Sequence, residues 1–173
     1  MKKAPLIACC ALLGICVSGA WSQTATYVGA QKCMPCHKAE ARGKQYPIWE
    51  ASKHSKSFAA LSSAQAATAA QALGVKDATA DPKCLRCHAA LFDKAADLKA
   101  EGVTCEICHG PGSDYKSLTV MKDKAEAVKK GLKLYADAGA VKAHCLTCHE
   151  NAHGKSFDFA AAWEKIKHGV PGK

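Results

Sequence analysis

The chain has 173 residues, enough for one domain, with a formal net charge of +9 and 11 cysteines. Hydrophobic residues make up 49% of it but aromatic residues only 6%, and its many alanines bury little area each, so the protein alone would form a thin core. The basic charge raises the question of nucleic acid or an anionic membrane, but no nucleic-acid motif, phosphate-binding glycine loop or serine triad stands out, and the cysteines indicate another function.

The first element is a secretory signal peptide, predicted over residues 1–22. Two lysines precede an apolar run over residues 4–17, and small residues such as Ala20 and Ser22 follow it. The run is shorter than the ~20 apolar residues of an ordinary membrane-spanning helix, so we expect cleavage and no stable membrane anchor. The sequence thus predicts a periplasmic or secreted protein, with residues 23–173 as its single domain, in a compartment where unpaired thiols oxidise.

Helix signals begin after the leader. Pro47 suits the first turn of a helix over about residues 48–61, which would carry His54. Ser63 can cap a second helix, and Gly74 would end it.

The second half of the chain has the same character. Residues 110–112 form a Gly-Pro-Gly turn, where a bulky side chain would collide with a neighbouring cofactor. An amphipathic helix is predicted over residues 122–134, and Asp158 can cap a last helix over residues 159–168. No strand pattern of useful length occurs, so we expect a mostly α fold with extensive loops.

Four copies of one cysteine motif follow the leader. Three of the 11 cysteines lie inside the leader, and the others form four C-x-x-C-H sequences. The copies are Cys33, Cys36 and His37; Cys84, Cys87 and His88; Cys105, Cys108 and His109; and Cys145, Cys148 and His149. Two thiols at this spacing can each form a thioether to one edge of a porphyrin, and the next histidine can ligate the iron. A shuffled chain would contain roughly 0.03 copies, so we predict four covalently bound haem c groups.

Zinc sites and disulfides are the competing interpretations of paired cysteines. Neither requires a histidine after every second cysteine, and thiol-rich zinc sites mostly belong to reducing compartments. The motif therefore favours haem. Four haems in so short a chain must pack against one another and form much of its interior, and we expect those of the closely spaced second and third motifs to be neighbours.

Four further histidines match the four irons in number: His54, His144, His153 and His168. They favour two histidines on every iron, which would saturate the metal so that it passes electrons and binds no substrate. Two alternatives stay open: one or two of these histidines are surface residues, or one iron lacks its second ligand and binds a small molecule. Met121 is another candidate axial ligand, although its lysine-rich surroundings favour a packing role.

Several strings beyond the haem motifs are shared with one group of proteins. They are Tyr27-Val28-Gly29, Trp49-x-x-Ser52-x-His54-x-x-x-Phe58, Gly102-Val103-x-Cys105-Glu106-x-Cys108-His109-Gly110-Pro111-Gly112, Phe157-Asp158-Phe159 and Trp163-x-x-Ile166-x-His168. With them the chain resembles the cytochrome c-554-like multihaem cytochromes over essentially all of its mature length.

The resemblance implies that His54 and His168 are distal ligands. It also implies a distal histidine shortly after the Gly-Pro-Gly turn, where this chain instead has a Ser-Asp-Tyr sequence ending at Tyr115. His144 or His153 would then substitute, or a histidine of a neighbouring subunit would. In a further alternative, Tyr115 forms a hydrogen bond near an open iron.

Motifs and resemblance together predict a periplasmic or extracellular carrier that passes electrons between redox partner proteins through closely packed haems. The alternatives are a redox enzyme for nitric oxide or another nitrogen species at one five-coordinate haem, and a filament joined by histidines of neighbouring subunits. In the family, donors include hydroxylamine-oxidising multihaem enzymes.

No nucleic-acid partner is expected, and the lysines within residues 122–133 either dock an acidic partner or form a solvated helix face. Haem propionates would neutralise much of the basic excess, and we expect the haem-free chain not to fold.

Overall fold

The computed structural model describes residues 24–150 and 152–169, so the predicted signal peptide lies outside the described residues. Within them the chain forms helices, turns and loops and no strand. The predicted mostly α fold with extensive loops is therefore confirmed. No helix in this part of the chain is long and apolar enough to cross a membrane.

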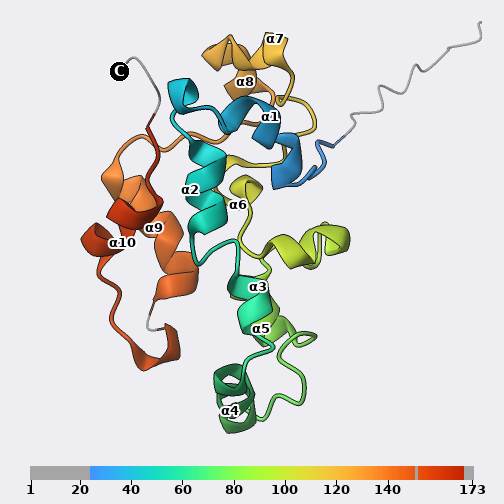
Figure 1. The fold of residues 1–173 in the computed structure, drawn as a ribbon, viewed down its shortest axis with the longest axis vertical. Helices are drawn as coiled ribbons and strands as arrows, with labels where there is room; N and C mark the ends of the chain where they lie inside the picture. The colour runs from blue at the N-terminus through green and yellow to red at the C-terminus, as the bar shows by residue number, and fades with distance from the viewer. Residues whose placement is uncertain (1–23, 151, 170–173) are drawn as a thin grey trace, which may run out of the picture.

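The helices are short, and the chain runs from α1 down to α4 and then back through α5 and α6 to α7 and α8 (Figure 1). The described α-helices are α1 (Met34–His37), α2 (Gln45–Ala51), α3 (Ser57–Ala60), α4 (Ala64–Ala72), α5 (Pro82–His88), α6 (Cys105–His109), α7 (Leu118–Met121), α8 (Lys124–Lys129), α9 (Ala138–His149) and α10 (Phe159–Ile166). Short 3-10 turns lie at Ala30–Lys32, Glu40–Arg42, Ala96–Glu101 and Ala152–Gly154. Figure 1 places α4 at one end of the molecule and α7 and α8 at the other.

Each C-x-x-C-H motif coincides with the end of a helix. The motif histidine is the last residue of α1, α5, α6 and α9. Residues three and four apart share one face of a helix, so a single turn places both thiols and the imidazole on the same side. Local backbone structure thus presents the three groups together, as attachment to one porphyrin edge requires.

The predicted continuous helix over residues 48–61 is wrong. The chain forms α2 and α3 instead, and His54 lies in the turn between them. The Ser52 hydroxyl donates to the carbonyl of Trp49 at 2.6 Å, and the Ser52 backbone is extended. Serine side chains compete with the backbone for such carbonyls, which ends the helix. His54 is therefore held by a turn rather than by a helix face.

The predicted helix caps are confirmed, whereas the predicted helix lengths are too long. The side chains of Ser63 and Asp158 accept backbone amides at the starts of α4 and α10, at 3.1 and 3.0 Å. The predicted helix over residues 122–134 is shortened to α8, because Gly131 turns the chain with a φ of 102°. The last helix ends at Ile166, so His168 lies just beyond it.

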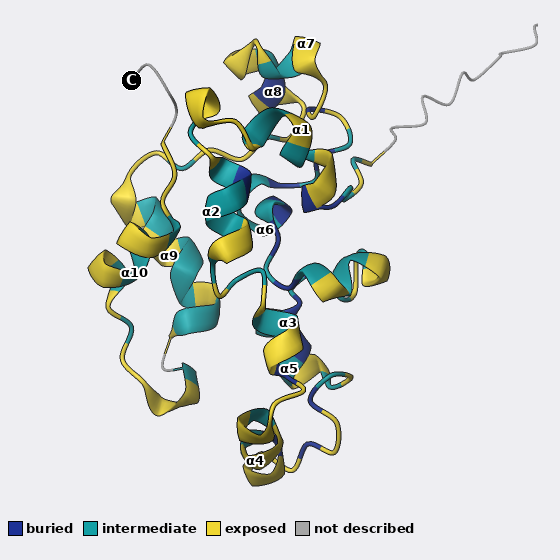
Figure 2. Ribbon diagram, viewed as in Figure 1, coloured by how far each residue is buried: buried dark blue, intermediate teal, exposed yellow. Residues whose placement is uncertain are grey.

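The aliphatic core is small and lies toward the α4 end of the molecule. Its buried members are Leu61, Ala70, Val75, Ala78, Leu85 and Ala89, from α3 to α5 and the loops between them. Figure 2 shows only scattered buried residues elsewhere, while much of α1, α2 and α9 is half-buried. This arrangement agrees with the thin protein core expected from composition.

Candidate haem sites

Three of the four further histidines lie opposite a motif histidine. The separations between ring centroids are 6.1 Å for His54 and His149, 6.1 Å for His88 and His153, and 5.8 Å for His109 and His168. An iron between two imidazoles holds their centroids roughly 6 Å apart, because each metal–nitrogen bond is about 2.0 Å and the ring centre lies about 1.1 Å further on. Each pair therefore has the spacing that suits one haem iron.

Turns rather than helix faces supply the second histidine of each pair. His54 follows α2, His153 lies in a 3-10 turn, and His168 follows α10. His153 has a left-handed backbone with a φ of 56°, which is uncommon for a residue other than glycine. Such conformations cost about 1–3 kcal/mol and cluster at ligand sites, so the position of His153 opposite His88 is consistent with a binding role.

Hydrogen bonds orient several motif histidines with one nitrogen outward. The Nδ1 atom faces an oxygen in three of them: His88 faces the carbonyl of Ser57 at 3.0 Å, His109 the carbonyl of Lys133 at 3.4 Å, and His37 the side chain of Gln45 at 3.3 Å. An oxygen acceptor requires the proton on Nδ1, which leaves the lone pair on Nε2 for a metal. The fourth, His149, is stacked on Phe157 with centroids 4.6 Å apart.

Burial keeps several of these imidazoles neutral. Burial is the main cause that lowers the pKa of His54, His109, His149 and His168. The charge of the facing histidine lowers the pKa of His54 and His109 further. A histidine must be deprotonated at the ligating nitrogen to bind a metal, so this environment favours the form that an iron needs.

The cysteine thiols approach one another between motifs. All eight described cysteines are free, and none forms a disulfide. A hydrogen bond with Cys105 is the main cause that lowers the pKa of Cys33. Burial, followed by a hydrogen bond with Cys148, raises the pKa of Cys87 to about 11. These thiol contacts join the first motif to the third and the second to the fourth, while the expected closeness of the second and third haems stays a prediction.

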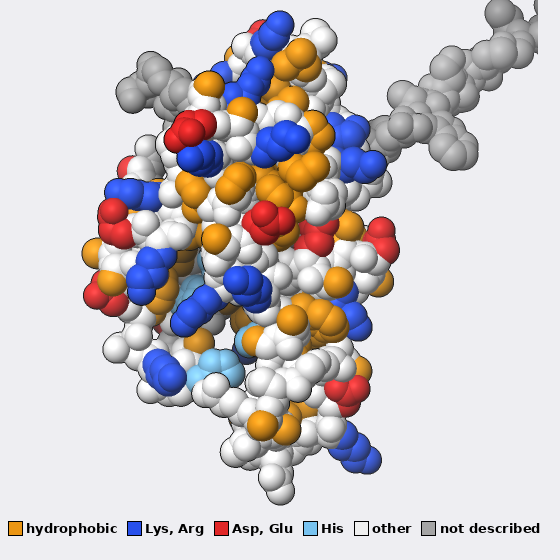
Figure 3. Space-filling model, viewed as in Figure 1, with side chains coloured by type: hydrophobic (Ala, Val, Ile, Leu, Met, Phe, Trp, Pro, Cys, Tyr) orange, Lys and Arg blue, Asp and Glu red, His pale blue; other side chains and the backbone are white. Residues whose placement is uncertain are grey.

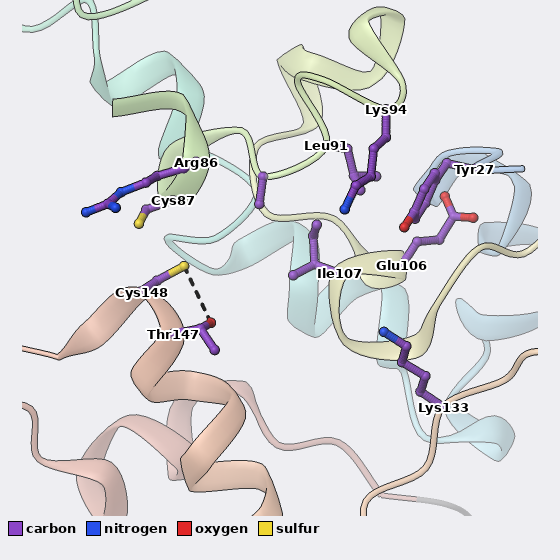
Figure 4. Close-up of a pocket in the computed structure, with 11 residues that line it drawn as sticks. Tyr27, Arg86, Cys87, Leu91, Lys94, Glu106, Ile107, Lys133, Thr147 and Cys148 are labelled. Carbon is purple, nitrogen blue, oxygen red and sulfur yellow. Dashed lines mark hydrogen bonds between the residues drawn. The ribbon is translucent and has the colours of Figure 1, made fainter. Parts of the chain in front are cut away.

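A cavity of about 270 Å³ is lined by residues of the second, third and fourth motifs (Figure 4). Cys87 and Cys148 border it, and so do the cationic side chains of Arg86, Lys94 and Lys133. Such cations suit carboxylates, and haem carries two propionates. Figure 3 shows a hollow in the surface flanked by histidine side chains, with lysine or arginine near its rim.

No group of three or more histidine, cysteine or acidic side chains in the described ranges is arranged to hold a metal ion. A zinc site made only of protein ligands would need such a group, usually with four ligands. A haem iron takes four nitrogens from the porphyrin and at most two ligands from the protein. Paired histidines beside paired thiols therefore fit haem better than zinc.

Two predicted ligands remain unmatched. No histidine ring in the described part of the chain faces His37 or His144 as closely as in the three pairs. His144 instead packs on Tyr135 with centroids 5.4 Å apart, and burial, then the charge of Lys133, lowers its pKa. Met121 ends α7 and is half-buried, and its candidacy as an axial ligand stays a prediction.

Tyr115 lies where the resemblance implied a histidine. It is buried, and its hydroxyl donates to the carbonyl of Gly110 at 2.8 Å, with the carbonyl of His109 at 3.2 Å. The hydroxyl hydrogen is therefore used to hold the end of α6. This contact supports His109 and does not favour a hydrogen bond to a ligand on another iron.

Protein atoms pack closely against the Gly-Pro-Gly turn, and the expected collision with a neighbouring cofactor stays a prediction. A Cβ on Gly110 would lie 2.7 Å from the carbonyl oxygen of Gly131, and one on Gly112 would lie 3.0 Å from Glu106 Oε1. Close protein atoms thus already exclude larger side chains here.

Sequence reasoning assigned no role to two further residues. The Ser57 hydroxyl lies 2.8 Å from the carbonyl oxygens of both His54 and His88, and it accepts the Val103 amide at 3.1 Å. It thereby ties together two histidine-bearing segments. The side chain of Glu106 is buried within the third motif. Nothing in the pattern marks Ser57, whereas Glu106 falls within a string that carries the family resemblance.

Comparison with known proteins gives one family and one relative. Residues 32–110 match the family described as cytochrome c554 and c-prime. The chain is 28% identical over 154 residues to the cytochrome c-554 of Nitrosomonas europaea, an alignment that covers 80% of this chain and 63% of the relative. The chain thus spans less than two thirds of the length of that relative. No solved structure matches the chain significantly.

Proposed function

We propose that the chain is a tetrahaem c-type cytochrome of a cytochrome c-554-like family and that it carries electrons between redox partner proteins. The single observation that carries the proposal is the spacing of the three histidine pairs, each suited to one iron and each beside a cysteine pair. When bound, haem supplies a reversible one-electron Fe(III)/Fe(II) couple. The protein holds, orients and desolvates it.

The proposed attachment follows the four motifs. Thioethers would form at Cys33, Cys36, Cys84, Cys87, Cys105, Cys108, Cys145 and Cys148, with His37, His88, His109 and His149 as proximal ligands. We assign His54 as the second ligand opposite His149, His153 opposite His88, and His168 opposite His109. The thiol contacts between motifs support haems close enough together for electrons to pass among them.

Compartment and partners belong to the same proposal. A signal peptide over residues 1–22 would export residues 23–173 as one periplasmic or secreted domain, where the eight thiols become thioethers rather than disulfides. The donor and the acceptor would be redox proteins. The lysines of α8 are exposed, which suits either a partner with an acidic surface or simple solvation.

Intact mass and protein-film voltammetry test the tetrahaem carrier. The exported protein should lack its leader and gain the mass of four haems, and voltammetry should resolve four one-electron couples. Replacing both Cys84 and Cys87 by serine should remove one haem from the mass. A mature protein with fewer than four covalent haems, or with no reversible couple, contradicts the proposal.

A second candidate function rests on His37. No described histidine pairs with it, so a haem attached at the first motif would have a free coordination position for a small molecule such as nitric oxide. The reduced protein should then bind one carbon monoxide per four haems. Binding of none would eliminate this candidate and leave the carrier.

A third arrangement, a filament joined through histidines, depends on His144. This histidine is free of the three pairs, so it could ligate an iron of another copy. Size-exclusion chromatography tests this, because only larger assemblies that dissociate in a His144→Ala variant would support it.

A further inference from the structure

Glu106 is a carboxylate inside a haem motif that forms no ion pair with a described residue. Its side chain is the largest fully buried one in the described chain, and the residue is 2% exposed. Its oxygens accept the amides of Val28 at 3.0 Å, Gly29 at 2.8 Å and Gly112 at 2.6 Å. None of the ion pairs in this part of the chain includes it. Its direct partners are therefore backbone amides, and it also lines the cavity that Arg86, Lys94 and Lys133 border.

The amides that hold Glu106 come from both sides of the contact between the first and third motifs. Val28 and Gly29 lie just before Cys33, and Gly112 belongs to the turn after His109. A second carboxylate, that of Glu101, accepts the amide of the next residue in line, Ala30, at 2.8 Å. Together the two carboxylates fix the segment before the first motif against α6.

The field of Glu106 reaches the residues around these motifs. Burial is the main cause that raises the pKa of Tyr115, and the charges of Cys33 and then Glu106 raise it further. The pKa of Cys33 is lowered mainly by the hydrogen bond with Cys105, and the Glu106 charge opposes that shift. A buried charge in low dielectric is screened less than a surface charge, so an iron held by this motif would also experience it.

We propose that Glu106 lowers the reduction potential of the haem attached at Cys105 and Cys108. Three haems would have an iron between two paired histidines, and among these three this haem would have the lowest potential. The proposal rests on the haem attachment given above. All three irons would have the same two ligands, so their environments decide the order of their potentials. A fixed negative charge favours Fe(III) over Fe(II), and of these three motifs only the third contains a buried carboxylate.

The magnitude follows from Coulomb's law. A unit charge about 10 Å from an iron, at an effective dielectric constant of about 20, changes the Fe(III)/Fe(II) ratio at a fixed potential by about tenfold. For a one-electron couple, a tenfold change corresponds to 59 mV. A shift of this size is readily resolved in a redox titration.

The first test uses the unmodified holoprotein. Its haem signals are followed by NMR or EPR during a potentiometric titration. The signal of the third haem, which is attached at Cys105 and Cys108, is identified as the one lost in a His168→Ala variant. The proposal expects this haem to be oxidised first among the three on raising the potential. If the haem opposite His54 or His153 has the lowest potential, the proposal is overturned, whether or not any Glu106 variant folds.

Two variants then separate charge from structure. Glu106→Gln keeps the shape but loses the charge, and should raise the potential of the third haem by about 59 mV. Glu106→Asp keeps the charge but shortens the reach, so it should lower the melting temperature yet leave the potential nearer to that of the wild type. Equal potential shifts in both variants, or no shift in a folded Glu106→Gln protein, overturn the proposal. Loss of a haem in mass spectrometry of the wild type would instead contradict the proposed function.

Discussion

Replacing His54 by alanine should convert one low-spin iron of the holoprotein into a high-spin iron that binds carbon monoxide. The centroids of His54 and His149 lie 6.1 Å apart, the separation for one iron between two imidazoles. A methyl group cannot ligate, and the iron held by His149 would lose one of its two protein ligands. Since His37 also lacks a facing histidine, the variant should have about two open irons of four, and the wild type about one.

The assay is a carbon monoxide titration of the reduced protein, with the total haem measured independently. Carbon monoxide bound per protein should rise from about one to about two. His54→Met is a matched variant: methionine can ligate and raises the potential, so it should restore much of the low-spin signal. His144→Ala is the negative control, because His144 packs on Tyr135 and faces no motif histidine.

An unchanged stoichiometry in His54→Ala would refute the assignment of His54 as a ligand. An increase in His144→Ala equal to that in His54→Ala would refute the pairing itself, since the structure brings only one of these residues to a motif histidine.

Three further predictions concern the segments that hold the histidines. Gly102→Ala should destabilise the holoprotein by about 1–3 kcal/mol, because φ is 67° and a Cβ would lie 2.5 Å from both the His54 carbonyl oxygen and Ser57 Oγ. In thermal melts the loss should exceed that of Gly74→Ala, where φ is 65° but no atom lies within 4 Å, and equal losses would contradict the packing argument. Ser57→Ala should cost about 0.5–1.5 kcal/mol in denaturant unfolding, because it removes the hydroxyl that lies between the His54 and His88 carbonyls, while the half-buried Val103 amide keeps its bond to the His54 carbonyl; an unchanged midpoint would show that the Ser57 contacts have no net value. Asp158→Ala removes the cap of α10 and should lower the stability by about 1 kcal/mol. Because His168 follows α10, the variant should also show more high-spin signal on mild heating. The control Asp123→Ala removes the cap of α8 and should leave that signal unchanged.

The sequence predicts those parts of the fold that depend on interactions between residues only a few positions apart. The C-x-x-C-H spacing places three groups on one helical turn, and the caps at Ser63 and Asp158 act on amides close in sequence. The break at Ser52 was missed because hydroxyl competition with the backbone is weak and depends on context.

The pairing of histidines could not be read from their number. His153 lies opposite His88 only because distant segments approach, and its left-handed backbone has no sequence signal. The resemblance indicated His54 and His168 as distal ligands, but not which iron each would serve. His144 matched the count, yet it packs against Tyr135.

Counting the low-spin and high-spin irons of the oxidised holoprotein by EPR is the most direct test of the histidine pairing. In that pairing three motif histidines face a second histidine and one motif histidine does not. The account predicts three low-spin ferric irons and one high-spin ferric iron in each protein. Four low-spin irons would contradict the open position at His37, and two or more high-spin irons would contradict at least one of the three pairs.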